Sequence, residues 1–494
     1  MATDPRTAAP EGAAPPPLDV EAFRARAHEL ADWMADYLAR VGEYRVQPDL
    51  APGTVRLRLP PAPPLEPESM DAILADFQRL VLPAMTHWNH PGFFGFFPAN
   101  TSPPSILAEM LTATLGAQCM SWSTSPAATE LEQVTMEWLA RMLDLPAGFT
   151  GVIQDTASAA TLVALITARD RLTRGEPPRR VEEMTVYTSP EANSSVPKGA
   201  RLAGFLPERI RFVETDESYA MRPDTLEEMI TDDRAAGLVP AAVVATVGTT
   251  SSAAVDPVRS IGEVCARQGI WLHVDAAFAG SAAILPEMRW ILDGIACADS
   301  FVFNPHKWLL VNFDCSAYFV RDVPALLRSF SATAHYLRAA HPGEVPDYRD
   351  WGIPLGRRFR ALKLWFVLRS YGVSGLQAMV REHIRLAERF AAWVDQSPDF
   401  ERLAPAMFGL VCFRHRPEGE REDAAALDAR NERLLSALNA SGKLFLTPTR
   451  LGGRYCLRLS VGHLTTTEAH VREAWALIQA TARSSAPDSG VRSY

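Results

Sequence analysis

Short apolar runs alternate with longer amphipathic stretches through the middle of the chain. The short runs have the length and the β-branched or aromatic content of strands: 184–187, 210–213, 241–247, 270–274 and 300–303. The stretches between them have helical character. This alternation predicts an α/β protein with a mostly parallel sheet and helices on both of its faces.

The pattern differs at the two ends of the chain. Asp19 is a suitable N-cap, and apolar positions after it recur at helical spacing: Phe23, Ala27, Leu30, Met34 and Tyr37. A proline-rich passage from Leu57 to Glu68 separates this helix from the next helical segment. The apolar stripe therefore needs a cover, which is either a partner copy or the chain's own core.

The C-terminal part indicates a second, smaller α/β domain. It combines a long amphipathic helix around His383 to Val394, strands in FGLVCFRH and RYCLRLSVG, and a helix from about Thr467. The chain is thus expected to divide into a disordered start (1–18), an N-terminal helical segment (19–95), a large domain (96–379), a small domain (380–483) and a disordered tail (484–494).

Composition narrows the class of protein. The net charge of −9 is spread over interspersed charges of both signs, which argues against a nucleic-acid or phospholipid partner. The six cysteines show no metal-binding spacing and several lie in apolar runs, as in a reduced cytoplasmic protein. The sequence has neither a secretion signal nor an apolar run long enough for a membrane span.

The strongest chemical signal is an acid and a lysine that each follow a strand. Asp275 ends the run Trp271–Val274, and Lys307 follows the run Ser300–Phe303, 32 positions further on. That spacing is about one βαβ unit with a helical connection, so both groups are expected at the carboxyl edge of a parallel sheet, where ligands bind. A lysine that forms a Schiff base and a carboxylate that holds a pyridine nitrogen protonated suit pyridoxal 5'-phosphate (PLP). The alternative is a solvated lysine and a capping aspartate.

The surrounding motifs carry a resemblance to a known family. HVDAAFAGSA and NPHKWLLVNFDCSA resemble the aromatic-L-amino-acid decarboxylases, which are group II PLP-dependent decarboxylases of fold type I. The similarity extends from about Asp19 to about Ile478 and includes HWNHPGFFGFFPA, SWSTSPAATELE, GVIQDTASAATLVAL, ATVGTTSSAAVDP and IPLGRRFRALKLWFVLRSYG. The resemblance implies a mostly parallel, seven-stranded type of sheet and decarboxylation of an aromatic L-amino acid. It also implies a homodimer in which residues 19–95 lie across the partner.

The resemblance also implies the cofactor residues. Lys307 and Asp275 would hold the reactive group, Thr250 would lie near the ring, and Ala277 would let the ring lie flat against the backbone. The phosphate-binding positions would be these: Thr156, Ala157, Ser158, Asn304 and His306. Taken without the family, the first three read as a helix N-cap and Thr250 as part of a turn.

Two positions decide the outcome of the reaction. Tyr336 lies where the family has its proton donor, although an isolated loop tyrosine is usually a surface residue. Asn193 lies where family decarboxylases have a histidine, and asparagine does not titrate near neutrality. Relatives with asparagine there include aldehyde synthases, which consume oxygen and release an aldehyde, ammonia, carbon dioxide and hydrogen peroxide. A homologue without turnover is a third possibility, but Lys307, Asp275 and Tyr336 together argue against it.

The resemblance places Phe96, Pro98 and Ala99 along the substrate ring. Catechol-preferring relatives carry hydroxyl groups in place of Phe96 and Ala99, so tryptophan or phenylalanine is expected to be preferred over dihydroxyphenylalanine. Gly356 lies where plant enzymes that accept indoles also have glycine, which makes tryptophan the first expectation. On residue type alone, the aromatic cluster around Phe96 reads equally well as core.

Overall fold

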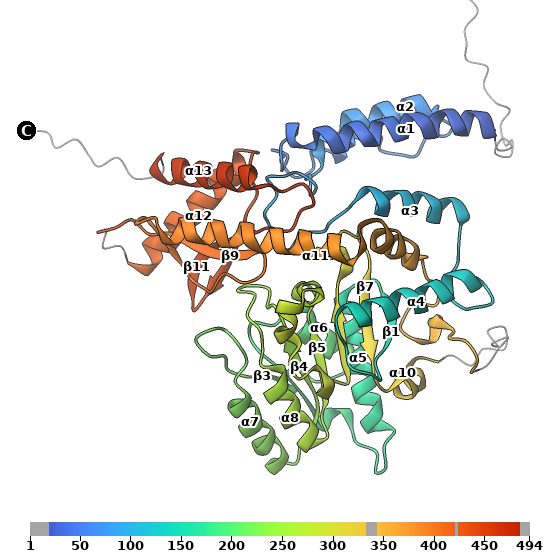
Figure 1. Cartoon of the computed structure of the whole chain (residues 1–494), viewed down its shortest axis with the longest axis vertical. Coiled ribbons are helices and arrows are strands. Elements are labelled where there is room, and N and C mark those ends of the chain that lie inside the picture. Colours follow the sequence, from blue (N-terminus) through green and yellow to red (C-terminus); the bar gives the residue numbers. More distant parts are fainter. Residues whose placement is uncertain (1–18, 332–342, 420–422, 485–494) are drawn as a thin grey trace, which may run out of the picture.

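The computed structural model describes residues 19–331, 343–419 and 423–484. They form a large α/β part with one seven-stranded sheet, a smaller part with a four-stranded sheet, and an N-terminal helical segment (Figure 1). In these described ranges, no helix combines the length and the apolar character that crossing a membrane requires.

The large sheet has the strand order β1-β7-β6-β5-β4-β2-β3. Its strands are β1 (Thr150–Gln154), β2 (Met184–Thr188), β3 (Ile210–Phe212), β4 (Val239–Thr246), β5 (Trp271–Asp275), β6 (Ser300–Phe303) and β7 (Ser316–Val320). The run from β6 to β3 is parallel, and β7 is antiparallel to both of its neighbours. This confirms the mostly parallel sheet and the five predicted strands, while β1 and β7 were not predicted.

Helices cover both faces of this sheet. The helices of the large part are α3 (Pro103–Leu115), α4 (Pro126–Met142), α5 (Ala157–Thr173), α6 (Ser195–Leu202), α7 (Pro223–Ala235), α8 (Val258–Gln268), α9 (Pro305–Trp308) and α10 (Val323–Phe330). One face packs against α5 and α6, where Val163 and Val196 join Val244 of β4 in a common core. The opposite face packs against α7 and α8, where Leu226 and Ile261 join a second core. Two apolar cores therefore enclose the sheet and hold the ends of its strands rigidly in place at the carboxyl edge.

The connection from β5 to β6 is helical, as expected, but it consists of short 3₁₀ turns. These are Ala279–Ile284, Pro286–Leu292 and Ile295–Cys297. Pro286 and Gly294, whose φ is +89°, interrupt any longer helix. The backbone of Gly280 also lies so close to Phe303 that a Cβ there would be 2.5 Å from the phenylalanine Cβ. This close packing joins the acid-bearing strand to the lysine-bearing one.

The smaller part contains an antiparallel sheet in the order β10-β11-β9-β8. Its elements are β8 (Phe400–Arg402), β9 (Leu410–His415), α12 (Ala424–Ala440), β10 (Thr447–Leu451), β11 (Arg454–Ser460) and α13 (Glu468–Ser484). The long helix α11 (Arg360–Asp395) runs from the large part into this one, with a non-helical residue at Gly372. The predicted domain boundary at 380 lies within α11 and stays a prediction.

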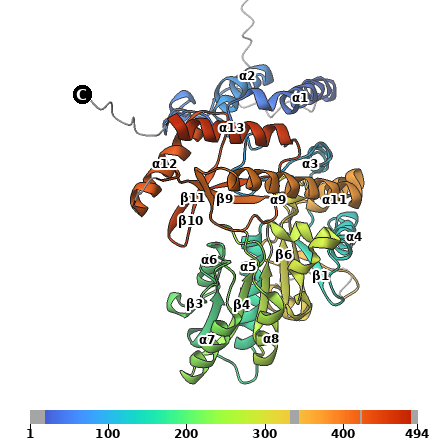
Figure 2. The ribbon, with the colours of Figure 1, turned by 60° about the vertical axis from the view of Figure 1, so that its left-hand side comes forward.

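The N-terminal segment lies on the side of α13 that faces away from the large sheet (Figure 2). Asp19 caps α1 (Val20–Arg40), because its side chain accepts the backbone N–H groups of Glu21 and Ala22. An ion pair of Arg26 with Asp71 joins α1 to α2 (Met70–Asp76). No residue of α1 is fully buried: Phe23 and Leu30 of its apolar stripe are exposed, whereas Met34 and Tyr37 are partly buried within this chain.

Candidate active site

The structure places Asp275 and Lys307 at the carboxyl edges of two neighbouring parallel strands. Asp275 is the last residue of β5, and Lys307 lies in α9, directly after β6. The Asp275 carboxylate is 3% exposed and accepts the backbone N–H of Ala277 at 3.0 Å. The carbonyl of Ala277 in turn accepts the N–H of Asn304 at 2.9 Å. The strand pairing predicted from the 32-residue spacing therefore brings the acid, the alanine and the lysine loop together.

The two charged groups influence each other in opposite ways. Burial raises the pKa of the Asp275 carboxyl, and the positive charge of Lys307 counteracts that rise. Burial lowers the pKa of the Lys307 ammonium, and the negative charge of Asp275 counteracts that fall. The lysine is partly exposed. Its amine is therefore easier to deprotonate than that of a solvated lysine.

A second cation approaches the lysine from the small sheet. The Lys307 Nζ lies 5.6 Å from the centroid of the Phe97 ring, and the Arg458 Cζ lies 5.1 Å from the same centroid. Phe97 also stacks on Phe278 at 4.0 Å, and Phe278 stacks on Trp308 at 4.5 Å. This aromatic stack fixes the Phe97 ring beside the amine of Lys307.

Arg458 was not identified from the sequence. It is 4% exposed and donates from Nη1 to Thr447 Oγ1 at 3.1 Å. Among the described residues, its Nε and Nη2 have no hydrogen-bond partner. Arg458 lies between Leu457 and Leu459 in the strand sequence, and this alternation is typical of a residue on a solvated face. The pattern therefore gave no indication of a buried charge at this position.

The residues assigned to the phosphate lie at the starts of two helices, α5 and α9. Thr156 is the N-cap of α5, where its Oγ1 accepts the N–H of Ala159 at 3.2 Å, so the capping alternative is observed. Ala157 is buried and Ser158 exposed. In the first turn of a helix, the backbone N–H groups lack intrahelical partners, which leaves those of residues 157 and 158 free to bind an anion.

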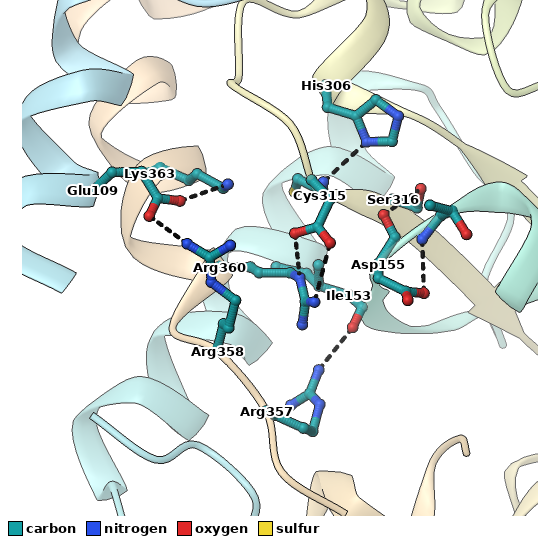
Figure 3. Close-up of polar contacts among 12 residues, drawn as sticks. Glu109, Ile153, Asp155, His306, Cys315, Ser316, Arg357, Arg358, Arg360 and Lys363 are labelled. Atoms are coloured by element: carbon teal, nitrogen blue, oxygen red, sulfur yellow. Dashed lines mark hydrogen bonds and ion pairs between the residues drawn. The ribbon is translucent and has the colours of Figure 1, made fainter. Parts of the chain in front are cut away.

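Asn304 and His306 lie next to this helix start. Ser316 links the two regions, since its hydroxyl donates to Asn304 Oδ1 at 2.6 Å. The same oxygen lies 3.4 Å from the carbonyl oxygen of Asp155, next to Thr156 (Figure 3). His306 is 3% exposed, and burial together with the charge of Lys307 lowers its pKa to about 3. The imidazole is therefore neutral at physiological pH.

Asn193 follows β2 and Thr250 follows β4, so both lie at the carboxyl edge of the sheet, where their side chains contact each other. Its Nδ2 donates to Thr250 Oγ1 at 3.1 Å, and its Oδ1 accepts the N–H of Ser195 at 2.9 Å. The amide is therefore oriented by the turn at the start of α6. It holds the threonine hydroxyl but carries no titratable proton.

The structure divides the predicted substrate residues between two places. Phe96, with a φ of 54°, is 49% exposed, stacks on Trp88 and donates its N–H to Thr447 Oγ1. Pro98 lies against Gly462, and Ala99 is partly buried beside it in sequence. Gly356 instead lies at the end of β1, where a Cβ would be 3.1 Å from Gln118 Nε2. Tyr336 lies outside the described residues, and its role stays a prediction.

Comparison with known proteins identifies the class of this site. Residues 52–416 match the family model described as the pyridoxal-dependent decarboxylase conserved domain. The chain belongs to this family. It is therefore a PLP-dependent carboxy-lyase of fold type I, as the sequence motifs indicated.

The relatives include more than one activity. A phenylacetaldehyde synthase of Arabidopsis thaliana is 45% identical over 94% of this chain and 96% of its own length. An aromatic-L-amino-acid decarboxylase of Rattus norvegicus is 44% identical over 94% of this chain and 98% of its own. The crystal structure of Catharanthus roseus tryptophan decarboxylase in complex with L-tryptophan has a TM-score of 0.91, with 41% identity over 95% of this chain and all of that one.

The geometry of this decarboxylase fits PLP. A lysine amine with a lowered pKa suits the aldehyde, and a buried carboxylate suits a protonated pyridine nitrogen. The free amides at the start of α5 suit the phosphate. Lys307, Asp275 and the α5 N-terminus are the groups that would hold the cofactor.

Proposed function

We propose that this decarboxylase converts an aromatic L-amino acid into the corresponding arylalkylamine and carbon dioxide. The observation that carries the proposal is the grouping of Lys307, Phe97 and Arg458. It combines a reactive amine, an aromatic surface and a buried guanidinium with two unpaired nitrogens. A guanidinium of this kind suits a carboxylate, which every amino-acid substrate carries.

The residues have distinct proposed roles. When bound, PLP supplies an electron sink for the negative charge that remains after carbon dioxide leaves. Asp275 keeps that sink effective by holding a proton on the pyridine nitrogen, and Arg458 orients the substrate carboxylate. The family resemblance assigns the return of a proton to Tyr336.

We propose tryptophan as the preferred substrate, with phenylalanine next and dihydroxyphenylalanine last. Phe96 and Ala99 bring no hydroxyl to the proposed ring site, so the hydroxyls of a catechol would lose hydrogen bonds to water without replacement. The Phe96→Tyr and Ala99→Thr double variant should raise kcat/KM for dihydroxyphenylalanine relative to tryptophan by roughly tenfold. Steady-state kinetics with both amino acids test this, and an unchanged ratio would contradict the assignment of these two positions.

The second candidate is an aldehyde synthase, which Asn193 favours. Its amide is engaged with Thr250 and Ser195 and cannot transfer a proton in the manner of a histidine. The similarity to the phenylacetaldehyde synthase supports the same alternative. In that case, oxygen would be consumed and the products would be an aldehyde, ammonia, carbon dioxide and hydrogen peroxide.

An aerobic product assay separates the two functions. Purified protein with PLP and one aromatic amino acid at a time is followed for amine, aldehyde and peroxide together, with Lys307→Ala as the inactive control. Amine without peroxide is the expected result. Aldehyde and peroxide in equal amounts would establish the synthase instead, and in that case Asn193→His should shift the product back toward amine.

We further propose that the active form is a homodimer. The exposed N-terminal part of the α1 stripe supports it, with Phe23 60% exposed and Leu30 38% exposed. Apolar area of this extent on a helix is normally covered by another surface. A second copy of the chain is the cover that the family resemblance implies.

A further inference from the structure

The segment from Phe313 to Ser316 contacts both residues that we assign to the cofactor phosphate on the lysine loop. Its Cys315 N–H donates to His306 Nδ1 at 2.9 Å (Figure 3), and its Ser316 hydroxyl donates to Asn304 Oδ1 at 2.6 Å. The Phe313 ring meets the imidazole edge-on at a centroid distance of 4.8 Å. This segment therefore determines the orientation of both side chains.

The Cys315 contact also determines the tautomer of His306. A neutral imidazole has one N–H and one acceptor nitrogen. Because Nδ1 accepts the Cys315 N–H, the proton of the neutral ring lies on Nε2. The histidine is thus a hydrogen-bond donor through Nε2 at any pH at which the protein works.

The peptide that carries this N–H is held by an ion pair. The amide nitrogen of Cys315 belongs to the same peptide group as the carbonyl of Asp314. The Asp314 carboxylate accepts from Nε and Nη2 of Arg360 at 3.0 and 3.3 Å, with the two side chains only 17% and 13% exposed. Arg360 is the first residue of α11, so the long helix anchors the peptide that orients the histidine.

Neighbouring cations in the same stretch make different contacts. Arg357 pairs with Glu132 of α4. Arg358 and Lys363 instead pair with Glu109 of α3 (Figure 3). Arg360 is the member of this group that reaches the 313–316 segment. Arg358, two residues before it, provides a matched control.

We propose that the Asp314–Arg360 ion pair is a positioning device for the cofactor phosphate, because it fixes the peptide that keeps His306 as an Nε2–H donor to that group. The inference rests on the proposed phosphate role of His306. Neither Asp314 nor Arg360 needs to touch the cofactor.

The test compares PLP with pyridoxal, which lacks the phosphate. Both are titrated into the cofactor-free forms of wild type, Asp314→Asn, Arg360→Met, the double variant and the control Arg358→Met, and binding is followed by the absorbance of the Schiff base. Loss of one hydrogen bond to a charged group should weaken PLP binding roughly tenfold to a hundredfold in each single variant. Pyridoxal binding should stay unchanged, and the double variant should bind PLP no more weakly than either single one.

Further measurements separate positioning from folding. The phosphorus NMR signal of bound PLP should move in Asp314→Asn and Arg360→Met but not in Arg358→Met. Loss of this largely buried pair also lowers the stability of the fold, so each variant is compared at a temperature below its own unfolding transition, where unchanged pyridoxal binding shows that the site is folded. Unchanged PLP affinity, or an equal loss for pyridoxal, would overturn the proposal. Wild type that takes up neither compound would overturn the cofactor assignment itself, and this inference with it.

Discussion

Single residues at this site act mainly through charge. Lys307 lies in a region that disfavours its ammonium form, and Asp275 partly restores it. The balance between burial and the acid sets how much neutral amine is present at a given pH. Burial alone would lower the pKa of Lys307 further, and the Asp275 charge limits that fall.

The pH dependence of cofactor capture should report this balance. Asp275→Asn removes the charge that raises the pKa of Lys307, so that pKa should fall further and the neutral amine should persist to lower pH. The midpoint of the capture rate against pH should therefore move to lower pH in the variant. The rate at which a borohydride-reducible absorbance band forms in cofactor-free protein measures it.

Asp299→Asn is the matched control for that experiment. Asp299 is also a partly buried carboxylate with a raised pKa, but it precedes β6 and lies at the opposite end of that strand from Lys307. Its substitution should leave the midpoint in place. A midpoint that moves to higher pH in Asp275→Asn would contradict the assigned direction.

At the scale of elements, the start of α11 and the chain before it join the large sheet to the helices around it. Arg357 forms a two-point ion pair with Glu132 of α4, in which both side chains are at most 7% exposed. Arg357 also donates to the carbonyl of Ile153 at the end of β1, and Glu132 accepts the N–H of the same residue. The pair therefore fixes the strand that leads into the proposed phosphate site.

Removing one partner of this pair should be costly. Glu132→Gln leaves the Arg357 guanidinium buried without a compensating charge, which should lower the free energy of unfolding by about 3–5 kcal/mol. Urea unfolding of the cofactor-free protein at one fixed protein concentration measures the change. Arg381→Met is the control, because its pair with Glu287 is about half exposed and its loss should change the free energy of unfolding far less. Equal effects of the two substitutions would contradict the special role of the buried pair.

At the scale of the whole molecule, the N-terminal segment lies at the far side of α13 from the large sheet (Figures 1 and 2). Its helix α1 exposes the apolar side chains of Phe23 and Leu30. Charged residues at these positions should prevent association, because a buried unpaired charge is strongly unfavourable in an interface. The Phe23→Glu and Leu30→Glu double variant should therefore be monomeric, whereas wild type should have twice the chain mass of 54.2 kDa. Sedimentation at matched concentrations tests this.

Phe212→Glu provides the control for the dimer experiment. Phe212 is 51% exposed, but it lies on β3, at the other end of the molecule from α1 (Figure 1). Its substitution should leave the dimer intact. A wild-type protein that sediments as a monomer would overturn the proposed assembly.

The sequence by itself determined the class of fold, the cofactor and the acid–lysine arrangement. Buried parallel strands appear as short apolar runs, and the one-unit spacing from Asp275 to Lys307 places both residues on one edge. These features are local or follow from chain connectivity, so they leave a signal in the order of residues. The family motifs are also local runs of residues, so they can be recognised in the sequence for the same reason.

Only the tertiary structure decided which distant residues meet. The antiparallel strand β7, the approach of Arg458 to Phe97 and the contact of Asp314 with Arg360 all join parts of the chain that have no periodic relation to one another. Arg458 looks solvent-facing in its strand because the Phe97 ring that it packs against comes from a distant part of the chain. Such contacts depend on how whole elements pack, and packing is a property of the folded molecule rather than of any one stretch of sequence.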